Sequence, residues 1–154
     1  MKTFRTIMVA VDFSDHSVRA AEHAAGLAND LNAKLLLTNI YNQRDVDMMQ
    51  EVAIRVPEFS VKKHLDEHIR DRKQKLEDLA KKLDSGTFEI ETTVQIGVPY
   101  EALLKEIEKQ EPDLLVMGVK GRSDVVDMIV GSCAQKMFRR SPIPLMSTRS
   151  HVPE

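Results

Sequence analysis

Tryptophan is absent from the 154-residue sequence, and aromatic residues make up only 5% of it. So few flat side chains argue against a base-stacking platform for single-stranded nucleic acid. The 22 basic and 24 acidic residues nearly cancel, to a formal net charge of −2, so the basic surplus typical of nucleic-acid binding is missing as well. These two shortages exclude nucleic acid from the expected partners.

Long apolar runs are also missing. No stretch reaches the roughly 18 consecutive apolar residues that a membrane-spanning helix needs. The first apolar run, residues 7–11, is too short for the core of a signal peptide. The single cysteine, Cys133, cannot form an intrachain disulfide. We therefore expect a cytoplasmic protein without a membrane partner, and the length predicts one domain over residues 1–154.

What the sequence does contain is an alternation of two apolar patterns. Continuous or alternating apolar runs predict strands, and apolar residues spaced three and four apart predict helices. Strands are expected at residues 7–11, 34–41, 88–94, 114–117 and 143–148. Helices are expected between them at residues 18–31, 60–83, 100–107 and 132–140. This order predicts an α/β fold, an open five-stranded parallel sheet with helices on both faces.

Three local features refine this outline. Ser14 or Asp15 is expected to cap the first helix. Residues 41–60 follow neither pattern and contain Pro57, so they are predicted to form a long irregular excursion or lid. Pro142 and Pro144 cannot donate hydrogen bonds to a neighbouring strand, so the last strand is expected at an edge of the sheet.

Glycine is scarce, with six residues in the chain, yet Gly118, Gly121 and Gly131 all follow the apolar run at residues 114–117. Glycines let a backbone turn tightly and come close to a ligand. Ser132 then opens the last predicted helix, where free N–H groups and the helix dipole favour an anion. A plain helix cap is the other interpretation of Ser132. On these residues alone, a phosphate site and an ordinary strand-to-helix connection are equally supported.

The predicted sheet strengthens the phosphate interpretation. Ligands of open α/β sheets bind beyond the carboxyl ends of the strands, near the point where the strand order reverses. Residues 11–14 follow the first strand, residues 39–41 end the second, and the glycine segment follows the fourth. This segment is neither the Walker phosphate loop nor the Gly-x-Gly-x-x-Gly dinucleotide fingerprint.

The whole chain resembles the universal stress protein family, in its ATP-binding branch. The resemblance rests on Val-Asp-Phe-Ser at residues 11–14, on Leu-Leu-Leu-Thr-Asn-Ile-Tyr at residues 35–41, and on the spacing Gly118, two residues, Gly121, nine residues, Gly131-Ser132. It implies a sheet of order 3-2-1-4-5 and an adenine nucleotide ligand, namely ATP with Mg²⁺ or a related nucleotide. It also implies a homodimer that pairs through the C-terminal edge strand.

The resemblance assigns residues to the base and the ribose. By position in the family, Val11 (through its main chain) and Asp12 lie beside the adenine and the ribose, and Ile40 lines the base pocket. A carboxylate at Asp12 can accept from hydroxyl or amino groups, and its alternative role is that of an acid favoured by a helix dipole. The sequence departs from the family pattern at Ala10, where some relatives have proline, and at Asn39, where many have histidine.

The phosphates are assigned in the same way. The resemblance implies that Met117 and Gly118 approach the sugar and first phosphate, and that the phosphate chain is held by Gly121, Gly131 and Ser132.

Two further residues complete the predicted binding set. Arg122 lies within the glycine segment, where a cation could neutralise phosphate charge; a solvated loop charge is the alternative. Cys133 follows Ser132 near a helix N-terminus, a position that can depress a thiol pKa. A small residue packed against the sheet is the alternative for Cys133, and it is the one we favour.

A short metal-binding motif competes with these assignments. His64, Glu67 and His68 match the His-x-x-Glu-His order of one class of zinc peptidases. They fall in a helix whose charged face continues past them, and short motifs arise freely in charged helices. We therefore assign no metal site.

The function expected from the sequence is that of a nucleotide-responsive stress or signalling factor. No residue is placed as a general base for water, so no catalytic residue is assigned, and slow ATP hydrolysis stays open as an alternative. A nucleotide-independent dimeric interaction module is the other alternative.

Overall fold

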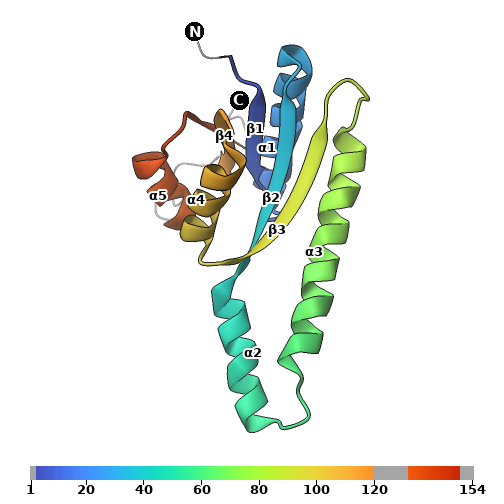
Figure 1. Cartoon of the computed structure of the whole chain (residues 1–154), viewed down its shortest axis with the longest axis vertical. Helices are drawn as coiled ribbons and strands as arrows, with labels where there is room; N and C mark the ends of the chain where they lie inside the picture. The colour runs from blue at the N-terminus through green and yellow to red at the C-terminus, as the bar shows by residue number, and fades with distance from the viewer. Residues whose placement is uncertain (1–2, 120–131, 150–154) are drawn as a thin grey trace.

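The computed structural model describes residues 3–119 and 132–149. Five parallel strands form one sheet in the order β3-β2-β1-β4-β5 (Figure 1). They are β1 (Thr6–Ala10), β2 (Lys34–Asn42), β3 (Ile90–Gly97), β4 (Leu114–Val119) and β5 (Leu145–Arg149). The predicted fold class and strand order are confirmed.

Helices cover both faces of the sheet. On one face α1 (Asp15–Leu31) and α3 (Val61–Leu83) pack against the odd-numbered side chains of β1 and β2. On the other face α4 (Pro99–Gln110) and α5 (Ser132–Arg140) pack against their even-numbered side chains. The α1 face is built of small side chains, which let the helix lie close to the strands; the buried ones are Ser17, Ala20, Ala21, Ala24, Ala25 and Ala28.

Ser14 caps α1, as the sequence predicts. Its side chain accepts a hydrogen bond from the backbone N–H of Ser17 at 3.3 Å. This bond satisfies one of the N–H groups that the first turn of a helix leaves without an intrahelical partner. The cap fixes where the chain turns from β1 into α1.

The prediction for residues 41–60 is wrong, because most of this segment is a helix. Asn42, the last residue of β2, caps α2 (Gln43–Arg55), and its side chain accepts from the N–H of Arg44 at 3.0 Å. α2 and α3 form a hairpin that projects beyond the carboxyl ends of the strands (Figure 1). The hairpin has its own small apolar cluster, made by Tyr41, Val46, Met49, Phe59, Val61, Leu65 and Ile69.

All five strands differ from their predicted bounds, by at most three residues at either end. β3 starts at Ile90 and continues to Gly97, beyond the predicted residues 88–94. β5 starts at Leu145, so Pro142, Ile143 and Pro144 precede the strand. β5 nevertheless lies at an edge of the sheet, as predicted. Within the described residues, no helix is long and apolar enough to cross a membrane.

Candidate functional site

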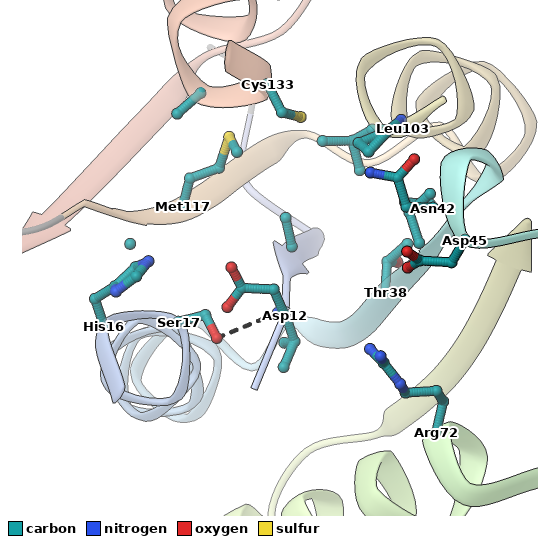
Figure 2. Close-up of a pocket in the computed structure, with 16 residues that line it drawn as sticks. Asp12, His16, Ser17, Thr38, Asn42, Asp45, Arg72, Leu103, Met117 and Cys133 are labelled. Carbon is teal, nitrogen blue, oxygen red and sulfur yellow. Dashed lines mark hydrogen bonds between the residues drawn. The ribbon is translucent and has the colours of Figure 1, made fainter. Parts of the chain in front are cut away.

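The carboxyl ends of β1, β2 and β4 surround a cavity of about 360 Å³ (Figure 2). β1 and β4 are neighbours in the sheet, but the helices that follow them lie on opposite faces, so the chain diverges there and leaves a crevice. The predicted binding residues whose side chains are described all line this cavity; they are Val11, Asp12, Ile40, Met117, Gly118 and Cys133.

Asp12 is held in place by the first turn of α1. Its Oδ1 accepts from the backbone N–H of Ser14 at 2.9 Å and from the Ser14 hydroxyl. Its own N–H donates to the Ser17 hydroxyl at 3.2 Å, the bond drawn in Figure 2. The carboxylate is therefore fixed at the cavity wall through one oxygen.

The surroundings of Asp12 favour its charged form. Burial raises the pKa of this carboxyl, but the hydrogen bonds from Ser14 outweigh burial together with smaller contributions from Ser17 and His16. The net result is a pKa below the ordinary value of 3.8. Asp12 thus presents a carboxylate, an acceptor for hydroxyl or amino hydrogens, at neutral pH.

Gly118 is a glycine because the backbone of α1 lies against it. A Cβ at this position would sit 2.6 Å from the carbonyl carbon of His16 and closer still to its oxygen. Real Cβ atoms do not make such contacts, so any side chain at residue 118 would push β4 and α1 apart. The sequence predicts that the glycine at residue 118 lets a ligand come close, whereas in the structure its lack of a side chain lets the backbone of α1 come close.

Near the end of β2, the backbone N–H and C=O of Ile40 lie at the cavity. Val11 N–H donates to the carbonyl of Thr38 at 2.8 Å, and the next bond of a parallel ladder would join Ile40 N–H to the Val11 carbonyl. The side chain of Asn39 takes that carbonyl instead, with its Nδ2 at 2.7 Å. Lys34 N–H bonds toward β1 and Leu35 N–H toward β3, so by alternation the N–H and C=O of Ile40 face the β1 side. No hydrogen bond joins them to the described residues that follow β1.

Thr38 adds a second polar group without a partner. The residue is buried in the cavity wall, and within the described part of the chain its hydroxyl makes no hydrogen bond. Buried polar groups are normally paired. A ligand that offers hydrogen-bonding groups to Thr38 and Ile40 would complete this wall.

Cys133 lies at the cavity, with its side chain half-buried against the α4–α5 face. Burial raises the pKa of its thiol, Lys136 opposes this rise, and Asp12 adds to it. The pKa depression that a helix N-terminus can cause is therefore not seen. Cys133 fits the interpretation as a small packed residue, one that also borders the cavity.

The match to the family model decides the classification: the model described as the universal stress protein family covers residues 3–149. The chain belongs to this family. Universal stress protein MJ0577 of Methanocaldococcus jannaschii is 19% identical over 151 residues, covering 93% of each chain. A universal stress protein of Thermus aquaticus is 28% identical over 148 residues, covering 95% of this chain and 99% of the relative.

Solved structures agree with this classification. The structure of MJ0577 matches with a TM-score of 0.75 at 17% identity, over 96% of this chain and 97% of that one. A universal stress protein in complex with cAMP matches with a TM-score of 0.63 at 25% identity, over 97% and 100% of the two chains. The first of these supports the fold, and the second also has a ligand.

Part of the predicted set in this universal stress protein lies outside the described residues, namely Gly121, Arg122 and Gly131. Ser132 is the first residue of α5, as predicted. The histidines of the possible zinc motif have other partners: His64 Nδ1 lies 2.9 Å from the Ser60 carbonyl oxygen, and His68 Nδ1 lies 2.7 Å from the Tyr41 hydroxyl. No cluster of three metal-ligating side chains is found among the residues that the structure describes.

Sequence reasoning missed the residues that the helical hairpin of this universal stress protein brings to the cavity. Asp45 of α2 and Arg72 of α3 both line it. Asp45 is three residues beyond the end of β2, a position that could have drawn attention had α2 been recognised. Arg72 carries no local signal, because it is one of many charged residues along α3.

Proposed function

We propose that this universal stress protein binds ATP or a related adenine nucleotide in the cavity and acts as a cytoplasmic, nucleotide-responsive factor. Two findings support the proposal. A relative of similar length forms a complex with cAMP, an adenine nucleotide. The cavity lies where open α/β sheets bind their ligands, and its volume of about 360 Å³ falls within the usual range of small-molecule sites.

The observation that carries the proposal is the unpaired end of β2. Ile40 presents one donor and one acceptor side by side, because both groups of a residue in a parallel strand point to the same neighbour. Adenine has the matching pair, the acceptor N1 beside the donor N6. In the proposed complex Ile40 N–H donates to N1, and the Ile40 carbonyl accepts from one N6 hydrogen.

We assign the rest of the nucleotide to the other residues of the predicted binding set. Asp12 accepts from the ribose hydroxyls, and Met117 and Gly118 lie beside the sugar. The phosphates then extend toward the first residue of α5, Ser132, where a helix N-terminus favours negative charge. Gly121, Arg122 and Gly131 are proposed to hold the phosphate chain together with Mg²⁺.

Titration calorimetry of the purified protein with ATP and Mg²⁺ tests the proposal. We expect saturable binding of one ATP per chain, and a change in the amide resonance of Ile40 when adenosine alone is added. GTP is the matched ligand control: its N1–H and 6-oxo group reverse the donor and acceptor pattern, so it should bind more weakly. Absence of saturable binding at millimolar ATP would contradict the proposal and favour the nucleotide-independent module.

The homodimer is proposed on the geometry of β5. Leu115 N–H donates to the Pro144 carbonyl, so by alternation Leu145, Ser147 and Arg149 point their backbone groups away from β4. An edge strand of this kind is a template for pairing with another chain. We expect sedimentation equilibrium to show a dimer that Ser147→Pro dissociates and Ser147→Ala preserves, since only proline removes the outward N–H. A monomeric wild-type protein would contradict this proposal.

A further inference from the structure

The helical hairpin places one acidic and one basic side chain in the wall of the cavity. Asp45 comes from the first turn of α2, and Arg72 comes from the middle of α3. Figure 2 shows both side chains pointing toward Thr38, on the opposite side of the cavity from His16 and Met117. They therefore lie at the end of the cavity that β2 forms.

Arg72 is held between two aromatic rings. Its guanidinium carbon lies 5.8 Å from the ring centre of Phe13 and 5.5 Å from that of Tyr41. Both distances fall within the range of cation–π attraction. Tyr41 is itself fixed, because it is buried and its hydroxyl is bonded to His68. These contacts fix the position of the guanidinium at the cavity wall.

The ring of Phe13 is placed by an uncommon backbone conformation. Phe13 has a φ of 67°, in the left-handed region that bulky residues rarely adopt. Conformations of this kind cost free energy and are concentrated at functional sites. Here the conformation occurs directly after Asp12, at the edge of the cavity, and it puts the ring next to Arg72.

Neither charged side chain is neutralised by a salt bridge. Within the described residues, no salt bridge joins Asp45 to Arg72 or joins either of them to a third residue. An acceptor and a fixed set of donors therefore face the same end of the cavity without being paired to each other. A ligand group with one donor and one acceptor would satisfy both.

We propose that Asp45 and Arg72 bind the second polar edge of the adenine base, with Asp45 accepting from N6 and Arg72 donating to N7. The proposal rests on the proposed function, in which Ile40 takes N1 and the other N6 hydrogen. Adenine offers this edge as an N6 donor beside an N7 acceptor. Hydrogen bonds to a charged partner are the stronger ones. In this arrangement the bound base contacts Ile40 of the sheet with one edge, and Asp45 of α2 and Arg72 of α3 with the other.

The test compares ATP with 7-deaza-ATP, which has a C–H group in place of N7. The wild-type protein should bind 7-deaza-ATP about 10-fold or more weakly, the usual size of one lost hydrogen bond to a charged group. Arg72→Met should weaken ATP binding by a similar factor and should bind the two ligands equally well. Equal binding of the two ligands by the wild-type protein overturns the proposal, whether or not the variant folds.

Lys75→Met is the matched control. Lys75 lies one turn further along α3 with its Nζ 5.7 Å from the same Phe13 ring, but it does not line the cavity. Its replacement removes the same charge and should leave the affinities for both ligands within about twofold of wild type. If Lys75→Met weakens ATP binding as much as Arg72→Met, the effect is general attraction of phosphates and the proposal is wrong. Failure of the wild-type protein to bind ATP would instead overturn the proposed function.

Discussion

Replacing Gly118 with alanine is expected to lower the free energy of unfolding by about 1–3 kcal/mol, the usual cost of an overpacked site. The new Cβ would overlap the His16 carbonyl, which is backbone and cannot rotate away. The same overlap displaces the first turn of α1, whose His16 and Ser17 line the cavity. ATP binding should therefore weaken together with stability. Urea unfolding and titration calorimetry measure the two effects.

Gly26→Ala is the matched control for this substitution. Gly26 lies within α1, and a Cβ there would meet nothing within 4 Å. Because alanine is the better helix former, this variant should gain about 0.5–1 kcal/mol of stability and bind ATP as the wild type does. If the Gly118→Ala protein is as stable as the wild type, the backbone of α1 does not exclude a side chain at residue 118.

The second large effect is expected at Asp12. Asp12→Asn keeps the size of the side chain but removes its charge, so the hydrogen bonds proposed between this residue and the ribose hydroxyls should become weaker. The loss should be about 10- to 100-fold in ATP affinity, the range for a hydrogen bond to a charged group. Asp15→Asn is the control, because Asp15 also lies in the first turn of α1 but does not line the cavity. Equal effects of the two variants would favour a role through the helix dipole only.

Asp12 should also influence how stability depends on pH. Its pKa in the folded protein lies below its ordinary value of 3.8, so the unfolded chain binds this proton more readily. The carboxylate therefore stabilises the folded state above pH 3.8, and this contribution is lost as the pH falls through the lower folded-state pKa. Urea unfolding of wild type and Asp12→Asn at pH 6 and at pH 3 should show a difference in stability that shrinks at pH 3. A constant difference would contradict the pKa shift.

Much of the fold follows from local sequence patterns. β1 and β2 are buried on both faces, so each appears as a continuous apolar run. Asp12 and Gly118 stand immediately after such runs, so their place at the strand ends could be read from the sequence. The common edge of a parallel sheet then predicts that they lie near one another, as they do in the cavity.

The hairpin could not be predicted in the same way. α2 buries only Val46 and Met49, while Met48, Val52 and Ile54 are exposed, so much of its apolar surface lies outside the core. The position of Arg72 depends on tertiary structure, since the rings that contact it come from the end of β2 and from the turn after β1. Likewise, no local sequence pattern predicts that the Asn39 side chain donates to the Val11 carbonyl and so ends the hydrogen bonding between β1 and β2.

The hairpin also makes the connection from β2 to β3 long, and this length has a small cost. The entropy lost on closing a loop grows only with the logarithm of its length, by about 0.6 kcal/mol for each doubling. The hairpin offsets part of that loss with its own apolar cluster. Its tip, residues 56–60, lies far along the hairpin from Asp45, at the start of α2. Insertions and deletions at the tip are therefore expected to leave the sheet and the cavity unchanged.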